Sequence, residues 1–153
     1  MIGRVLTFYL CGTLCGIDIK TAKEINRNIF YTPIPGAANH IVGLLNLRGQ
    51  VVTLLDLAQL LKFTQEGERK NSHCIILKSR AEDPDQVGFF IDKRGDVIDV
   101  TPEMCEVVPA NLVDSDKKFI QEVVTLENEI LLILDLGAMM QMESGYLVER
   151  GVS

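Results

Sequence analysis

The chain has 153 residues, of which 47 % are hydrophobic and 24 % charged, a composition that is typical of a globular protein with a buried core. Its net charge of −6 argues against non-specific binding to nucleic acid, because phosphates attract positive surfaces. No apolar run reaches the roughly 18 residues of a membrane-spanning helix, and the start of the chain lacks a signal-peptide pattern. These features favour a cytoplasmic protein without direct membrane insertion.

The first third of the chain is expected to form two strands, over residues 5–10 and 14–19. One or two helical turns could follow over residues 18–25, because Ile19, Ala22 and Ile25 recur at three-residue spacing. Residues 31–35 should be extended, since prolines at positions 33 and 35 bias the residues before them away from the helix.

Residues 41–61, IVGLLNLRGQVVTLLDLAQLL, are the most distinctive segment. Apolar, partly β-branched runs lie on both sides of Arg48 and Gly49, which predicts a β-hairpin. Gly49 tolerates the positive φ of a tight turn, and Arg48 is the only charge in the middle of the segment. Asp56 follows the second strand and can cap a short helix over residues 57–61.

The second half repeats this order. Strands are expected over residues 74–78, 87–91 and 96–100, with a turn over residues 92–95 and a short helix that starts near Pro102. Polar stretches over residues 64–72, 79–86 and 112–118 are expected to be connections. Residues 141–153 have weak amphipathicity, and we expect a frayed C-terminal tail there.

The segment 41–61 recurs 79 positions later, over residues 120–140, as IQEVVTLENEILLILDLGAMM. The apolar positions coincide, Asp56 falls on Asp135, and Gly49 falls on Asn128, which also tolerates the left-handed region. Arg48, however, falls on Glu127. The framework is duplicated and the charge at its turn is not. We therefore interpret the duplicated apolar pattern as a requirement of the fold, and Arg48 as a candidate functional residue.

The duplication predicts a mainly β fold. Half a chain, about 75 residues, is marginal for an independent core. Two pseudo-symmetric, five-stranded β-barrels with short helices, packed along a shared hydrophobic seam, would solve this problem and protect the strand edges. We therefore expect residues 1–153 to form a single domain built of two barrel subdomains.

Motifs for catalysis are missing from the sequence. It has no phosphate-cradling glycine loop and no G-x-S-x-G elbow, and neither histidine lies in a motif suited to a catalytic triad. The pair Asp56 and Asp135 could act in acid–base chemistry, but the position of each before a short helix favours capping. The sequence therefore gives no support for an enzyme.

The chain has four cysteines, Cys11, Cys15, Cys74 and Cys105. The spacing of Cys11 and Cys15 hints at metal binding, but a structural zinc site usually shows a second ligand pair, and the second half offers none. We therefore predict no metal and no cofactor. We also predict no disulfide between Cys11 and Cys15, because a reducing compartment keeps thiols reduced.

The motif GxxNLRGxxxxxxDL over residues 43–57 resembles that of the CheW family of bacterial chemotaxis coupling proteins. Further similarity comes from TPIPG at residues 32–36 and VGFFIDKRGDVIDV at residues 87–100, so the resemblance covers nearly the whole chain. It implies two packed, five-stranded SH3-like barrels. It also implies a non-catalytic adaptor, recruited to receptor arrays, that links chemoreceptor (methyl-accepting chemotaxis protein) signalling tips to the regulatory domain of the histidine kinase CheA.

The resemblance places a receptor-facing groove between the barrels. The partner-binding residues that it implies are Ala22, Glu24, Gly43, Asn46, Arg48, Gly49 and Val97. Arg48 could bind partner carboxylates or carbonyls, could brace the groove by pairing with Glu24, or could be an ordinary exposed turn residue. Two other functions stay open: a small-ligand or catalytic protein that uses the seam, and the coupling domain of a CheV-like protein.

Overall fold

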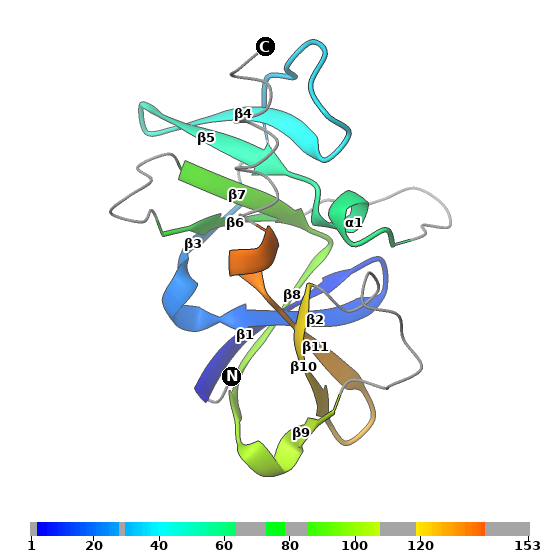
Figure 1. Cartoon of the computed structure of the whole chain (residues 1–153). Helices are drawn as coiled ribbons and strands as arrows, with labels where there is room; N and C mark the ends of the chain where they lie inside the picture. Colours follow the sequence, from blue (N-terminus) through cyan, green and yellow to red (C-terminus); the bar gives the residue numbers. More distant parts are fainter. Residues whose placement is uncertain (1–2, 28–29, 64–72, 79–85, 108–118, 140–153) are drawn as a thin grey trace.

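The computed structural model describes residues 3–27, 30–63, 73–78, 86–107 and 119–139, and its fold is mainly β, as predicted (Figure 1). A six-stranded sheet has the order β8-β1-β2-β11-β10-β9, and a five-stranded sheet has the order β3-β6-β7-β5-β4. The strands of the first sheet are β1 (Gly3–Leu10), β2 (Thr13–Asp18), β8 (Lys93–Val100), β9 (Cys105–Glu106), β10 (Ile120–Thr125) and β11 (Ile130–Leu134). Those of the second are β3 (Ala22–Asn26), β4 (Ile41–Leu47), β5 (Gln50–Leu55), β6 (His73–Leu77) and β7 (Gln86–Ile91). Short helical segments are η1 (Ile19–Thr21), α1 (Leu57–Leu60) and η2 (Pro102–Met104).

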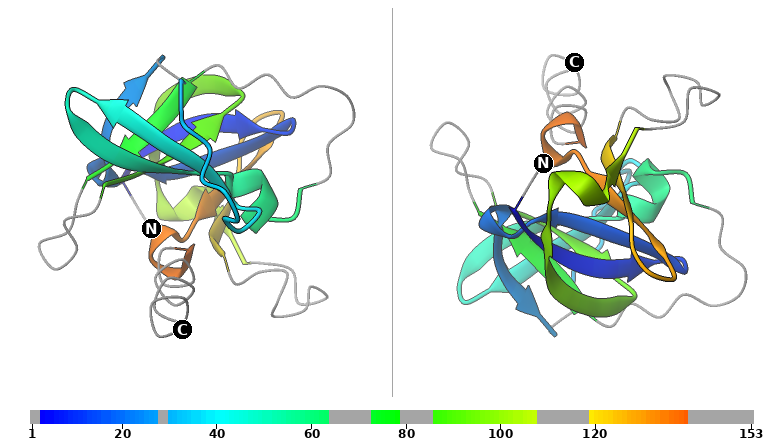
Figure 2. Two further views of the ribbon diagram at one scale, coloured as in Figure 1. Left: turned by 90° about the horizontal axis from the view of Figure 1, so that it is seen from above. Right: turned by 90° about the horizontal axis from the view of Figure 1, so that it is seen from below.

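The two halves of the chain exchange hairpins, so each sheet contains strands from both halves. The β1–β2 hairpin lies between β8 and β11, whereas the β6–β7 hairpin lies between β3 and β5 (Figures 1 and 2). The pairs β2–β11 and β5–β7 are parallel, and a short hairpin connection cannot place two strands in parallel. In both pairs the partner strand comes from the other half of the chain. The described ladders leave both sheets open, so they do not show closed five-stranded barrels.

The duplicated hairpins have the same register. Leu45 pairs with Val52 in the first hairpin, and the residues 79 positions later, Val124 and Leu131, pair in the second. The register also slips at equivalent places, between residues 41 and 43 and between residues 120 and 122. The duplication that the sequence predicts is therefore confirmed in the pairing of the strands.

The two hairpins differ at their turns. Arg48 and Gly49 both have positive φ, 52° and 83°. Glu127 and Asn128 do not have positive φ, so Asn128 does not adopt the left-handed conformation that its residue type tolerates. The second turn is closed in another way, because the Leu126 amide donates to the carbonyl oxygen of Glu129 at 2.9 Å.

Of the one or two helical turns that residues 18–25 could hold, a single turn over residues 19–21 is present. The Asp18 carboxylate accepts a bond from the amide of Lys20 at 3.0 Å, which starts a single 3₁₀ turn, η1. Residues Ala22–Asn26 then form β3, because pairing with β6 overrides the helical spacing of the sequence.

The turn expected over residues 92–95 is shorter than predicted, because β8 already begins at Lys93. The Asp92 carboxylate accepts a hydrogen bond from the amide of Cys11 at 2.7 Å, which joins this turn to the turn between β1 and β2.

Both aspartates that follow the duplicated hairpins cap helical segments, as predicted. The Asp56 carboxylate accepts from the amide of Ala58 at 3.1 Å at the start of α1. The Asp135 carboxylate accepts from the amide of Ala138 at 3.0 Å, where residues 136–139 are helical. Capping therefore accounts for this carboxylate pair.

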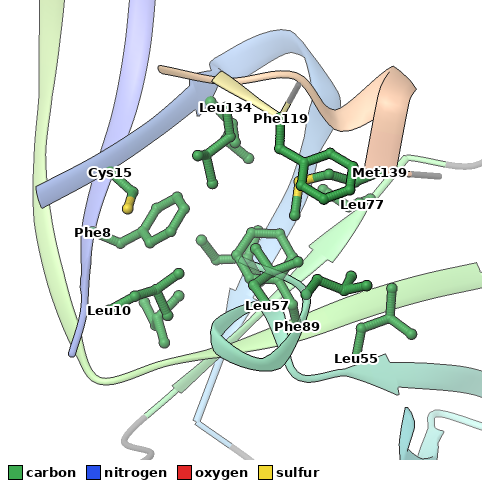
Figure 3. Packing of buried hydrophobic residues seen from close by; sticks show 14 of the residues in the cluster. Phe8, Leu10, Cys15, Leu55, Leu57, Leu77, Phe89, Phe119, Leu134 and Met139 are labelled. Atoms are coloured by element: carbon green, nitrogen blue, oxygen red, sulfur yellow. The ribbon is translucent and has the colours of Figure 1, made fainter. Parts of the chain in front are cut away.

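The largest hydrophobic cluster lies between the two sheets (Figure 3). Phe8 of β1 and Phe89 of β7 are completely buried, with ring centroids 5.4 Å apart. Leu57 of α1 and Met139 pack into the same cluster. The shared hydrophobic seam that the sequence predicts is therefore present. The connections expected over residues 64–72, 79–86 and 112–118 and the tail 141–153 lie outside the described residues, except for Gln86, which begins β7.

A candidate partner-binding site at the turn of the central hairpin

Arg48 and Glu24 form an ion pair at the surface of the five-stranded sheet. Arg48 Nη2 lies 2.6 Å from Glu24 Oε1, and the two side chains are 63 % and 27 % exposed. Glu24 belongs to β3 and Arg48 to the turn that ends β4, and these two strands are the opposite edges of the sheet. The sheet therefore curls so that its edges approach each other. The pairing of Arg48 with Glu24 is therefore present, whereas the role of either residue in partner binding stays a prediction.

Asn46 and Gly49 support the turn from within the hairpin. The side-chain carbonyl oxygen of Asn46 accepts a bond from the amide of Gly49 at 3.0 Å. Both turn residues have positive φ, the combination that a two-residue turn needs to follow the twist of its strands. Glycine adopts this backbone conformation readily, whereas arginine does so at a cost.

Close packing against a neighbouring segment explains why position 43 is a glycine. A Cβ at this position would lie 2.4 Å from the carbonyl oxygen of Thr32. Thr32 and Leu44 exchange two backbone hydrogen bonds, of 2.8 and 2.9 Å, which hold the extended segment 30–35 against β4. Next to Thr32, the ring of Tyr31 packs on that of Phe90, with centroids 5.7 Å apart. Gly43 therefore allows the close approach of this segment.

The structure brings some of the predicted site residues together. Asn46, Arg48 and Gly49 lie at the turn of the central hairpin, and Glu24 of β3 is linked to this turn by its bond to Arg48. Gly43 lies further back on β4, next to Thr32.

Ala22 and Val97 lie outside this linked group. Ala22 starts β3, two residues before Glu24. Val97 belongs to β8 in the other sheet, where it pairs with Leu6 and is 45 % exposed.

Three polar residues beside the ion pair were missed by the sequence analysis. Lys23 donates to the side chain of Gln86 at 3.5 Å, and Gln86 in turn donates to the side chain of Gln50. Lys23 occupies the register slip between Ala22 and Glu24, a bulge of the kind that redirects side chains. Gln50 directly follows the turn. No motif marks these residues, because they come from three different strands.

The equivalent turn of the second hairpin is anchored differently. The hydroxyl of Tyr9 lies 3.0 and 3.1 Å from the carboxylate oxygens of Glu129, and this hydrogen bond raises the pKa of Tyr9. The ammonium group of Lys93 lies 5.6 Å from the centroid of the Tyr9 ring. The two turns therefore present different chemistry, an arginine at the first and acidic residues at the second.

Three of the four cysteines have raised pKa values, which makes them poor nucleophiles. Burial raises the pKa of Cys15 to about 12 and that of Cys74 to about 11. Cys105 donates to the carboxylate of Glu122 at 3.1 Å, and this bond raises its pKa as well. Within the described part of the chain, no three His, Cys, Asp or Glu side chains converge as metal ligands. The absence of a metal, a cofactor and a Cys11–Cys15 disulfide stays a prediction.

Comparison with known sequences matches the chain to one protein family. The family model of the CheW-like domain matches residues 4–144. The chain is 28 % identical to the chemotaxis protein CheW of Bacillus subtilis over 141 residues, which cover 92 % of this chain and 88 % of that protein. It is 31 % identical to the chemotaxis protein CheW of Treponema pallidum over 137 residues, 87 % of this chain and 79 % of that protein.

A solved structure agrees with this match. The crystal structure of the scaffolding protein TtCheW from Thermoanaerobacter tengcongensis superposes with a TM-score of 0.74 at 25 % identity, over 89 % of this chain and 86 % of that one. In the described ranges, no helix has the length and apolarity needed to cross a membrane. Since the family model matches nearly the whole chain, this protein belongs to the family of CheW-like domains.

Proposed function

We propose that this protein is a non-catalytic adaptor of chemotaxis-type signalling. In this role it links the signalling domain of a chemoreceptor, a methyl-accepting chemotaxis protein, to the regulatory domain of the histidine kinase CheA. It acts in the cytoplasm at receptor arrays. The observation that carries the proposal is the match of the CheW-like family model over residues 4–144. The relatives are chemotaxis proteins and a scaffolding protein, which supports it.

The turn of the central hairpin supplies a chemical basis for partner binding. A guanidinium group carries five N–H donors in a planar fork and is always charged. One terminal nitrogen of Arg48 bonds to Glu24, while the side chain is 63 % exposed. The remaining donors can bind carboxylates or carbonyls of a partner through charge-assisted hydrogen bonds. The partner-binding residues that we propose are Ala22, Glu24, Gly43, Asn46, Arg48, Gly49 and Val97.

The test compares Arg48→Ala with Glu127→Ala at the equivalent turn. Losing a charge-assisted contact costs about 1–3 kcal/mol, so Arg48→Ala should weaken binding to receptor tips or CheA about 5- to 150-fold. Both variants should fold, because an exposed ion pair contributes little to stability. Thermal melts establish folding; binding to each partner and kinase activation are then measured.

Two results would overturn the proposal. If the native protein binds neither a receptor signalling tip nor CheA, the adaptor role is wrong. If Arg48→Ala and Glu127→Ala both bind like the native protein, the adaptor role stands and the assignment of the site to Arg48 is wrong.

A further inference from the structure

The backbone of Arg48 has a conformation that is intrinsically unfavourable for an arginine. Its φ of 52° is one of three positive values at non-glycine positions in the described chain, with Cys11 and Lys62. Such a conformation persists where the surrounding structure imposes it. The guanidinium is held at Glu24, but this contact involves the flexible end of a long side chain. A second restraint has to act on the backbone of the turn.

Asn46 supplies that restraint. It lies between buried Leu45 and Leu47, points away from the core and is exposed. Its side-chain oxygen accepts the amide of Gly49 at 3.0 Å. This bond passes over Leu47 and Arg48 and fixes the second turn residue relative to the last residues of β4.

The second hairpin shows the same strand pairing without this bond. Position 125, which corresponds to position 46 after the 79-residue shift, holds Thr125, whose hydroxyl lies 3.5 Å from the Glu106 carboxylate on β9. In this hairpin neither Glu127 nor Asn128 has positive φ. Equal register with unequal turns indicates that the strands alone do not set the turn, and the Asn46–Gly49 bond is a contact that, of the two described hairpins, only the first makes.

We propose that Asn46 is a positioning residue: it holds the Arg48–Gly49 turn in the left-handed conformation and thereby aims the guanidinium at Glu24 and at the partner. The inference rests on the proposed function for its partner-binding part and revises the role of Asn46 from contact to support. Asn46 acts through Arg48 and does not itself touch the partner.

The structural arm of the test uses Asn46→Ala, with Asn46→Asp as the conservative variant that keeps the acceptor oxygen and Thr125→Ala as the matched control. Nuclear magnetic resonance then gives the hydrogen exchange of the Gly49 amide and the H–N–Cα–H coupling of Arg48. Asn46→Ala should speed Gly49 exchange and shift the Arg48 coupling, Asn46→Asp should restore both, and Thr125→Ala should change neither. Unchanged Gly49 exchange in Asn46→Ala would overturn the inference.

The functional arm measures binding to a receptor signalling tip. Asn46→Ala should weaken binding about 2- to 12-fold, the effect of one neutral hydrogen bond, and should have no further effect in the Arg48→Ala background. A further loss in that background would mean that Asn46 contacts the partner directly, which overturns the positioning role. If the native protein binds no receptor tip or CheA, the proposed function fails, while the structural arm still decides whether Asn46 sets the turn.

Discussion

Arg48 combines local strain with surface exposure, and this combination needs an explanation at the scale of the residue. Its φ of 52° is unfavourable for any residue with a Cβ, and its ion pair with Glu24 is too exposed to contribute much stability. A sequence selected for stability alone would place Gly or Asn here. Departures of this kind from local preference are expected at functional sites.

Comparing Arg48→Gly with Arg48→Ala isolates the backbone strain. Both variants lose the guanidinium, but only glycine adopts the left-handed conformation without the Cβ penalty. The free energy of unfolding should therefore be higher for Arg48→Gly, by about 1 kcal/mol, while both bind partners equally weakly. Urea denaturation measures the difference. An alanine variant as stable as the glycine variant would mean that the turn does not hold positive φ at this position.

The sequence identifies Arg48 by a simple signal, because it is the one position of the duplicated hairpin at which a positive charge is replaced by a negative one. It gives a weaker basis for Glu24, which comes from the family resemblance. Lys23, Gln50 and Gln86 could not be found, because their proximity depends on a bulge in β3 and on the parallel pairing of β5 with β7. Neither feature leaves a pattern in the residues themselves.

At the scale of the element, the two copies of the hairpin show which features are framework. The ladders, the register slips and the capping aspartates Asp56 and Asp135 recur. Gly43, however, falls on Glu122. The first hairpin needs a glycine there because Thr32 lies against the strand, whereas Glu122 accepts a bond from Cys105. Equivalent positions have therefore acquired different contacts.

Gly43→Ala should displace the segment 30–35 from β4. The added Cβ would lie 2.4 Å from a backbone oxygen of Thr32, which cannot move without the segment that carries it. Overpacking of this kind typically costs about 1–3 kcal/mol. Denaturation should show that loss, and hydrogen exchange should become faster at the amides of Thr32 and Leu44. Val51→Ala, at an exposed position of the same hairpin, should stay within about 0.5 kcal/mol of the native protein. Native-like exchange at Thr32 in Gly43→Ala would contradict the packing role of Gly43.

At the scale of the whole molecule, the sequence predicts the positions of the strands well, but it predicts poorly which strands pair with each other. Apolar runs and turn residues locate most strands, and the 79-residue shift predicts the equivalence of the two hairpins. The exchange of hairpins between the halves could not be predicted, because β1–β2 and β6–β7 are both suitable neighbours for either set of strands. Long-range pairing, such as that of β2 with β11, is decided by the shared core.

The exchange of hairpins between the two halves of the chain implies that the two sheets unfold together. Phe8 of β1 and Phe89 of β7 belong to one buried cluster that also includes residues of α1, β2, β5, β6 and β11. Loss of either ring therefore removes contacts from both sheets. Because each sheet also contains strands from both halves, neither half retains a complete sheet when the other opens.

Phe8→Ala tests this coupling, with Phe30→Ala as the matched control. Phe8 is 0 % exposed, so its truncation should lower the free energy of unfolding by about 3–5 kcal/mol, whereas Phe30 is 88 % exposed and its truncation should cost less than about 0.5 kcal/mol. In Phe8→Ala, hydrogen exchange should accelerate by the same factor in β4–β5 and in β10–β11, although Phe8 lies in neither hairpin, because protection in a cooperative unit follows the global stability. Acceleration confined to the six-stranded sheet, or two separate unfolding transitions, would mean that the sheets are independent units and that the exchanged hairpins do not couple them.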